Sequence, residues 1–481
     1  MARTASRPKR RPAQRHTADP NPPHITRLVP KGETAAEKQA WGRALRTSVP
    51  RSAHGEFTLA PDRPDPVALL EEQGAERVQD LVPIRYGRML ASPFAFLRGS
   101  ALVMTADLAR LPSSGLFVQA CGDAHLSNFG IFKSPERRLI FDLNDFDETY
   151  PAPFEWDVKR LAASAMVAAR SNGFSEADSR ATARTVGRAY RQKMVELSAL
   201  PFMDVWYQRF DVEAWFRQVK RTGRAPRAAA LIQRAETRNH LGALAKFAEP
   251  VNGKWQIRPA PPLVVRLPRG RGTRQILRNA LRDYVASLPK ELTPITRHYH
   301  FVDAARKVVG VGSVGTEAFM ALFLGDRDFD PIFLQFKEAG HSVLERYTVP
   351  KIHTHQGERV VYGQRLMQAA SDPFLGWFRG TGPRGLDFYV RQLLDGKVSV
   401  EVETLNQGPL KGYVSACAET LARAHARSGH SSAIAGYLGT GDTFDKAIEA
   451  FAVKYADQTL ADHAALVDAE ASGRITARRD V

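Results

Sequence analysis

The stretch from residue 118 to residue 151, VQACGDAHLSNFGIFKSPERRLIFDLNDFDETYP, constrains the fold of this chain more than any other part of the sequence. Its apolar runs are short and stop at polar or turn-forming residues, which is typical of buried strands that flank loops. Carboxylate and amide side chains stand at the ends of these runs. The fold must therefore gather several of them at one place, either as turn formers or as a site.

Two interpretations of these polar side chains compete. Most Asp and Asn residues near strand ends form turns or cap helices. Hard cations such as magnesium, however, bind carboxylate and amide oxygens together with substrate phosphates. Asp123 and Asn128 lie five residues apart in one loop, and Asp142 follows fourteen residues later, after an apolar run. This spacing is typical of a phosphotransferase catalytic loop followed by a metal-binding Asp on the next strand.

The motif CGDAHLSNFG resembles the H-G-D-x-H-x-x-N loop of aminoglycoside phosphotransferases, choline kinases and their relatives in the protein-kinase-like fold. The segment LIFDLNDFDE…WDVKRLA is similar to the segment that follows this loop in the same proteins. The resemblance implies that Asp123 is the catalytic base and that Asn128 and Asp142 bind magnesium. It also implies that Asp157 supports the loop from the next helix.

Three positions leave alternatives open. Cys121 stands where these relatives have a histidine, and we interpret it as an apolar thiol in a structural position rather than a nucleophile. His125 matches the second histidine of the loop, so it either supports catalysis or is simply packed. Asp145 competes with Asp142 for the metal because it lies twelve residues before Asp157, close to the spacing in the relatives. A capping role is the alternative for Asp145.

A glycine-rich segment farther along the chain, GVGSVG, indicates a phosphate-binding loop. Glycines in a G-x-G-x-x-G pattern let backbone N–H groups approach phosphate oxygens. The flanking sequence is typical of strand, turn and strand, whereas a dinucleotide-binding fold would need strand, loop and long helix. The predicted nucleotide-binding residues of the loop are Gly310, Gly312, Ser313 and Gly315.

A lysine and a glutamate complete the predicted nucleotide site. Lys337 in FLQFKEA resembles the lysine on the third strand of a kinase small lobe, and a surface lysine at a strand end is the alternative. Glu358, 21 residues later, has suitable spacing for the helix glutamate that pairs with this lysine, and Glu345 is nearer. An exposed glutamate at a helix start is the alternative for Glu358.

The order of these motifs is inverted relative to ordinary kinases, in which the small lobe precedes the catalytic loop. The segment YVSACAETLARAHARSGH near the C-terminus resembles the helix that runs just before H-G-D in aminoglycoside phosphotransferases. A circular permutation reconciles these observations. We therefore predict an α+β, two-lobed protein-kinase-like fold, circularly permuted, with a small antiparallel-sheet lobe and a mainly helical large lobe. The predicted parts are a disordered basic tail, a large lobe with the catalytic loop, a small nucleotide-binding lobe and C-terminal helices that complete the large lobe: residues 1–55, 56–299, 300–400 and 401–481.

Segments such as ASPFAFLRGSA, CGDAHLSNFG, KVVGVGSVGT, LQFKEA and FYVRQLLDGK together resemble an uncharacterised bacterial family, domain of unknown function 2252. This resemblance spans about residues 60–460 and implies no substrate.

Charge and composition bound the remaining possibilities. The formal net charge is +17, with six of the cationic side chains in the first seventeen residues. Such a run is typical of a solvated basic arm, or of one that binds nucleic acid or an anionic surface. A second basic run, residues 266–282, is either a solvated face or a hint of an anionic acceptor. Two cysteines exclude a disulfide framework, and the absence of a long apolar run or a secretory pattern predicts a cytoplasmic protein without a membrane span.

The sequence thus predicts a phosphotransferase that uses ATP and Mg²⁺ and acts on a hydroxyl group of an unidentified small molecule or protein. Three alternatives stay open at this point: an enzyme of the same fold that transfers AMP, a nucleotide-binding pseudoenzyme, and a basic nucleic-acid-binding protein.

Overall fold

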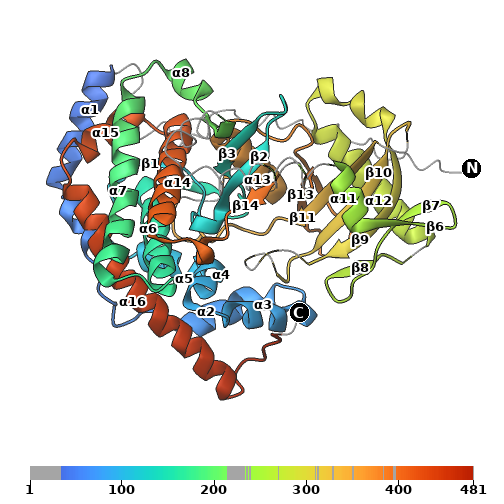
Figure 1. Ribbon diagram of the computed structural model, residues 1–481, viewed down its shortest axis with the longest axis horizontal. Coiled ribbons are helices and arrows are strands. Elements are labelled where there is room, and N and C mark those ends of the chain that lie inside the picture. The colour runs from blue at the N-terminus through green and yellow to red at the C-terminus, as the bar shows by residue number, and fades with distance from the viewer. Residues whose placement is uncertain are drawn as a thin grey trace, which may run out of the picture.

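The computed structural model describes residues 34–213 and 240–479, together with residues 233 and 237, apart from residues 269, 309, 311, 313, 328, 329, 349–351, 383 and 394–396. Helices and small antiparallel sheets alternate along the chain, so the expected α+β class is confirmed. Helices gather on one side of the molecule and a six-stranded sheet on the other, with a strand hairpin between them (Figure 1). No helix in the described ranges is long and apolar enough to cross a membrane.

The helical side is built from the N-terminal part, the segment after the hairpin and the C-terminal part of the chain. Its largest members pack against one another around one apolar core, in which α6 is buried over almost its whole length. The Ser175 hydroxyl accepts a hydrogen bond from Asp178 N at 3.1 Å and caps the following helix. The helices are α1 (Ala35–Ala44), α2 (Pro66–Ala75), α3 (Val82–Met89), α4 (Pro93–Gly99), α5 (Ala101–Leu108), α6 (Phe154–Ser171), α7 (Glu176–Ser198), α8 (Phe202–Tyr207), α14 (Gln407–Ser428), α15 (Ser431–Leu438) and α16 (Thr443–Ala471).

Two small sheets carry the acidic stretch. In one, β1 pairs with β4, and in the other the order is β14-β2-β3-β5. The two short buried strands expected from the apolar runs on either side of the Asp123 loop are β1 and β3, and every residue of β3 is buried. Strand β2, which lies between them in the chain and forms a hairpin with β3, was not predicted. The strands are β1 (Phe117–Ala120), β2 (Phe129–Lys133), β3 (Leu139–Leu143), β4 (Tyr150–Pro153), β5 (Phe210–Asp211) and β14 (Val398–Ser399).

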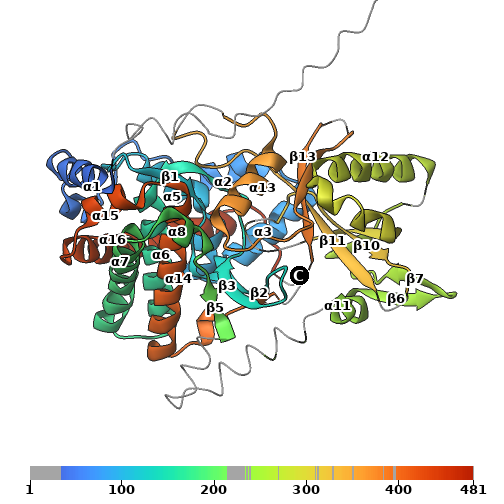
Figure 2. The same ribbon diagram turned by 90° about the horizontal axis from the view of Figure 1, so that it is seen from above.

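The third sheet has six antiparallel strands in the order β12-β13-β11-β10-β9-β8. Alternate residues of each strand face opposite sides, so β11 contributes Phe336 to the core under α12 and Phe333 to the core under α11. Figure 2 shows these two helices on opposite sides of the sheet. The elements are α11 (His240–Phe247), β6 (Ala248–Val251), β7 (Lys254–Ile257), β8 (Val264–Arg266), α12 (Arg271–Ser287), β9 (His300–Lys307), β10 (Ala318–Leu324), β11 (Pro331–Glu338), α13 (Gln356–Met367), β12 (Gly376–Arg379) and β13 (Asp387–Gln392).

The sequence located most of these elements but misplaced two boundaries. The strand, turn and strand expected beside the glycine-rich segment are β10 and β11, and the helix expected to carry Glu358 is α13. The stretch expected to be a tail, residues 1–55, includes α1, which packs against α15 through the close approach of Gly42 to Ala433. The sheet begins before residue 300, because β8 pairs with β9. Helix α1 is polar and carries little apolar signal, so its packing against α15 was not predictable from its own sequence.

Candidate functional site

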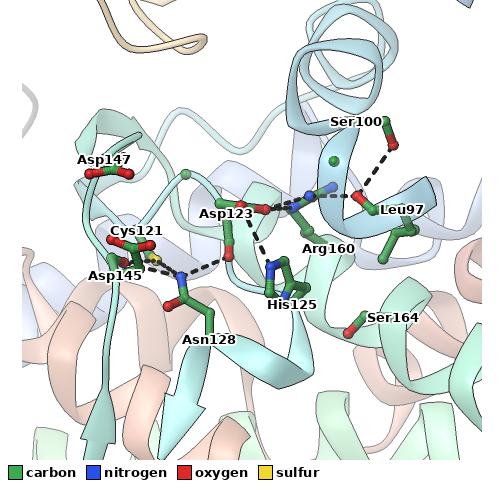
Figure 3. A network of polar contacts seen from close by, with 12 residues as sticks. Leu97, Ser100, Cys121, Asp123, His125, Asn128, Asp145, Asp147, Arg160 and Ser164 are labelled. Atoms are coloured by element: carbon green, nitrogen blue, oxygen red, sulfur yellow. Dashed lines mark hydrogen bonds and ion pairs between the residues drawn. The ribbon is translucent and has the colours of Figure 1, made fainter. Parts of the chain in front are cut away.

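A cavity of about 200 Å³ lies between the two ends of the β2–β3 hairpin, the helical side and the glycine-rich segment at residues 310–315. Its wall includes Asp123 and Asn128 from the loop after β1, Asp145 from the segment after β3, and Gly310 and Gly312. These residues come from positions nearly 190 apart in the chain. The fold therefore brings the predicted catalytic loop and the predicted phosphate-binding loop to one place, and Figure 3 shows the polar contacts at its centre.

Asp123 is held by two cationic or polar neighbours. Arg160 of α6 donates from Nε to Asp123 Oδ1 at 2.6 Å. On the other oxygen, Oδ2 lies 3.6 Å from His125 Nε2. Burial lowers the pKa of His125 to about 4, and the positive charges of Arg98 and Arg160 act in the same direction against Asp123. Near neutral pH His125 is therefore an uncharged imidazole beside Asp123 Oδ2.

Asn128 has a fixed amide orientation. Its Nδ2 donates to the carbonyl oxygens of Asp123 at 3.0 Å and Asp145 at 3.1 Å, and it contacts Cys121 Sγ at 3.3 Å. The amide oxygen Oδ1 is buried and has no hydrogen-bond partner among the residues that the structure describes. Cys121 is fully buried, and burial raises the pKa of its thiol well above the usual value. The thiol is thus a packed group in this loop, as the sequence suggested.

Lys337, on β11 of the six-stranded sheet, contacts the acidic segment, by which we mean residues 144–148 after β3. Its side chain is 1% exposed, and Nζ lies 2.6 Å from Asp147 Oδ2 and 3.3 Å from Asp145 Oδ1. Tyr389 on the neighbouring strand donates to the other oxygen of Asp147 at 2.7 Å. Burial would raise the pKa of Asp145, but Lys337 and Arg391 outweigh it and hold that pKa below its usual range. Asp145 is therefore an ionised carboxylate at the cavity wall.

Backbone carbonyls of the glycine-rich segment are held by the N-terminal helices. Arg77 donates to Gly312 O at 2.9 Å, and Arg88 donates to Gly310 O at 2.6 Å. Gly310 and Gly315 have φ values of +52° and +92°, and residues other than glycine rarely adopt such a backbone conformation. These contacts place the segment over the cavity. Ser313, also predicted to bind the nucleotide, lies outside the described residues.

Asp157 and Asp142 both lie away from the cavity wall. The Asp157 carboxylate accepts hydrogen bonds from Cys121 N at 2.6 Å and Gly122 N at 3.0 Å, and His425 Nε2 lies 3.1 Å from it. It thus contacts the loop that it was expected to support. Asp142 is 1% exposed, forms an ion pair with Arg423 and accepts from Ala369 N at 2.8 Å. Both of its carboxylate oxygens are engaged inside the protein.

The predicted partner of Lys337 is not the residue that the structure places beside it. Glu358 is half-buried near the start of α13, while Lys337 pairs with Asp145 and Asp147. The next residue, Arg359, is fully buried instead and donates to Asp147 O and Gly340 O, both at 2.8 Å. Helix α13 therefore stabilises the acidic segment through an arginine.

A second cavity, of about 590 Å³, adjoins the first and shares Asn144 and Lys397 with it. Gln335 on β11 and Leu393 at the end of β13 line it. Burial lowers the pKa of Lys397 to about 7, so this side chain carries a variable charge near neutral pH. Together the two cavities offer a polar end around Asp123 and a wider end beside the sheet.

The residues present suit a divalent cation that also binds substrate oxygens. Asn128 Oδ1 and the Asp145 carboxylate are the two oxygen donors that line the cavity and belong to the predicted metal set. Within the described residues, no three His, Cys, Asp or Glu side chains are grouped so as to hold a metal by themselves. Magnesium commonly uses one or two protein oxygens and completes its shell with phosphates and water.

Three arginines of this site were missed by the sequence analysis: Arg98, Arg160 and Arg359. Each lies in a helix, where arginine at an amphipathic position is usually exposed. Arg160 in the motif WDVKRLA was the nearest to a usable signal, because it follows Asp157 by less than one helical turn.

Comparison with known proteins gives a family and no activity. A family model with the description "Uncharacterized protein conserved in bacteria (DUF2252)" matches residues 77–469. No curated protein and no solved structure matches the chain.

Proposed function

The chain belongs to this bacterial family, DUF2252, whose description names no activity, and from the site itself we propose an ATP- and Mg²⁺-dependent phosphotransferase that acts on a hydroxyl acceptor. One observation carries the proposal: a single cavity is lined by Asp123, Asn128, Asp145 and the glycine-rich segment, and Lys337 is ion-paired to its acidic wall. Phosphoryl transfer needs such a set, because its catalysis consists of positioning and electrostatic stabilisation.

Each residue has a role in this proposal. Lys337 and the backbone N–H groups of the glycine-rich segment bind the phosphates of ATP. Asn128 Oδ1 and Asp145 would hold Mg²⁺, which would supply positive charge beside the transferred phosphoryl group. The orphaned amide oxygen of Asn128 supports this assignment, and the internal ion pair of Asp142 favours Asp145 as the metal ligand.

Asp123 directs the acceptor. Arg160 fixes Asp123 Oδ1, which leaves Oδ2 to accept the hydrogen bond of the acceptor hydroxyl and then its proton. The acceptor oxygen forms a bond to the γ-phosphorus as the bond from phosphorus to the β–γ bridging oxygen breaks, so ADP leaves. Neutral His125 beside Oδ2 keeps the carboxylate in place without supplying a competing proton.

The proposal includes a fold relationship. The strands β9, β10 and β11, the glycine-rich turn between the first two, Lys337 on the third and helix α13 follow the order of a kinase small lobe. Helix α14 with L-A-x-x-H and the loop at Asp123 belong together in that scheme although they lie at opposite ends of the chain. We infer a circularly permuted protein-kinase-like architecture on this ground.

Nucleotide binding tests the proposal first. Thermal unfolding of the full chain would be followed with Mg²⁺, with and without ATP, for wild type, Asp145→Asn and Lys337→Ala. A ligand that binds only the folded state raises stability by about 2.7 kcal/mol at a hundredfold excess over its Kd. We expect this stabilisation in wild type and its loss in both variants, each compared with its own ligand-free transition.

Matched controls are the exposed residues Asp80 and Lys254, as Asp80→Asn and Lys254→Ala. These two proteins should respond as wild type does. No stabilisation of wild type at millimolar ATP, or an equal stabilisation of Asp145→Asn and Lys337→Ala, would overturn the proposal. Product analysis then separates phosphoryl transfer, which releases ADP, from AMP transfer, which releases pyrophosphate.

A further inference from the structure

Arg98, at the end of α4, is a cation without a counter-ion at the wall of the candidate active site. Its Nε is buried and has no hydrogen-bond partner, and no ion pair or hydrogen bond joins its guanidinium to any residue in the described part of the chain. The carbonyl oxygen of the preceding residue, Leu97, accepts a hydrogen bond from Arg160 Nη2 at 2.9 Å. The backbone that carries Arg98 is thus tied to the arginine that holds Asp123.

The other cations around this cavity are engaged. Arg160 is paired with Asp123, Lys337 with Asp145 and Asp147, and Arg77 with carbonyls of the glycine-rich segment. An arginine that is half-buried without a partner loses solvation without compensation. A ligand that supplies an anionic group would remove this cost, and the planar guanidinium suits phosphate and carboxylate oxygens.

The position of Arg98 indicates which ligand this is. Figure 3 shows Leu97 and Ser100, which flank it in the chain, on the side of Asp123 opposite to Asp145 and Asp147. The backbone on either side of Arg98 therefore lies across Asp123 from the carboxylates of Asp145 and Asp147. The charge of Arg98 helps to lower the pKa of His125, which lies 3.6 Å from Asp123 Oδ2, so the guanidinium acts on the same part of the cavity as Asp123. An added Cβ at Gly312 would lie 3.7 Å from Arg98 O, so the backbone of Arg98 also borders the glycine-rich segment.

We propose that the hydroxyl acceptor is an anionic small molecule, and that Arg98 binds its phosphate or carboxylate while its hydroxyl group faces Asp123. The assignment rests on the proposed phosphotransferase function and names the acceptor class of that site. The basic run at residues 266–282 does not supply this anion site, because α12 packs on the face of the sheet opposite to Lys337.

The test uses the full chain saturated with Mg²⁺ and ADP, a nucleotide that cannot transfer a phosphoryl group from a γ position. Thermal unfolding is followed while inorganic phosphate, glycerate, glycerol or choline is titrated. Phosphate and glycerate separate the two anionic chemistries, glycerol is the neutral control and choline the cationic one. Proteins compared are wild type, Arg98→Ala, Arg98→Lys and Arg188→Ala, which changes an exposed arginine of α7.

At least one of the two anions should stabilise wild type and Arg188→Ala. We expect its apparent affinity to be about 10- to 100-fold weaker in Arg98→Ala and partly restored in Arg98→Lys, because hydrogen bonds to charged groups contribute about 1.5–3 kcal/mol. Glycerol and choline should not stabilise any of the proteins through this site.

Three results would overturn the assignment: stabilisation by choline, anion binding that is unchanged in Arg98→Ala, or no anion binding by wild type. A selective loss of ATP over ADP affinity in Arg98→Ala would also overturn it, because Arg98 would then bind the γ-phosphate. Failure of the proposed function is recognised separately. It would appear as no stabilisation of wild type by Mg²⁺ and ADP, and the phosphate titration without nucleotide would still test Arg98.

Discussion

At the scale of single residues, two aspartates three positions apart are placed in different environments. Asp142 lies within β3 and is paired inside the protein with Arg423 of α14. Asp145 follows the end of that strand, is 38% exposed at its side chain and faces Lys337 across the cavity wall. The two residues are of the same type, and they differ because Asp142 lies within the buried strand β3 whereas Asp145 lies beyond its end, at the cavity.

Asp142→Asn should reduce stability more than nucleotide binding. The change leaves the charge of Arg423 buried without its counter-ion, which costs about 3–5 kcal/mol. Asp145→Asn should change the free energy of unfolding by about 1 kcal/mol or less, because its side chain is partly solvated. Urea unfolding of the two variants measures the difference. If Asp142→Asn were as stable as wild type but lost Mg²⁺-dependent ATP binding, Asp142 would be the metal ligand.

At the scale of elements, the N-terminal helices act as a support for the glycine-rich segment. Arg77 and Arg88 bind its carbonyls, and Val78 N donates to Gly315 O at 2.7 Å. These contacts fix the backbone of a segment whose N–H groups bind phosphate in the proposed function. The support comes from residues more than 200 positions earlier in the chain, so a local pattern gives no sign of it.

Arg77→Ala should loosen that segment. Amide hydrogen exchange in residues 310–315 is expected to become faster, because two carbonyl contacts of Arg77 are lost. Arg43→Ala, at an exposed position of α1, serves as the control. Unchanged exchange in Arg77→Ala would show that the segment keeps its conformation without this support.

A second element contact makes stability depend on pH. His54 is fully buried, its Nε2 lies 2.7 Å from Tyr437 Oη of α15, and burial lowers its pKa to about 3 from 6.5. Between these two pH values the unfolded chain binds a proton that the folded protein does not bind. The stability present above pH 6.5 is therefore lost progressively as pH falls towards 3.

His54→Gln should remove this part of the acid sensitivity. The contribution at pH 5 is about 2 kcal/mol relative to pH 7.5, so the fall in the free energy of unfolding between these pH values should be smaller in the variant by about that amount. Urea unfolding at both pH values measures it, and other histidines such as His125 cancel in the comparison. Equal falls in both proteins would show that His54 is protonated in the folded state.

At the scale of the whole molecule, the sequence predicted individual strands and motifs better than the contacts between distant segments of the chain. Short apolar runs and glycine turns located β1, β3 and β9 to β11, because strand periodicity and turn chemistry are local. The loop at Asp123 and Asn128 carried its own motif. The partners Arg98, Arg160 and Arg359 were not predictable, since they reach the site from helices whose packing depends on distant segments. The pairing of Lys337 with Glu358 rested on spacing alone and was replaced by the nearer acids Asp145 and Asp147.

The same arrangement predicts how a nucleotide changes the molecule. The proposed ligands Asn128 and Asp145 belong to the helical side and the hairpin, while Lys337 belongs to the six-stranded sheet, which has its own cores on its two faces. Mg²⁺ and ATP should therefore slow amide exchange both in the hairpin, residues 129–143, and in the strands of residues 300–338. In Lys337→Ala the protection of the strands should fall more than that of the hairpin. Protection confined to one of the two parts in wild type would contradict a nucleotide site shared between them.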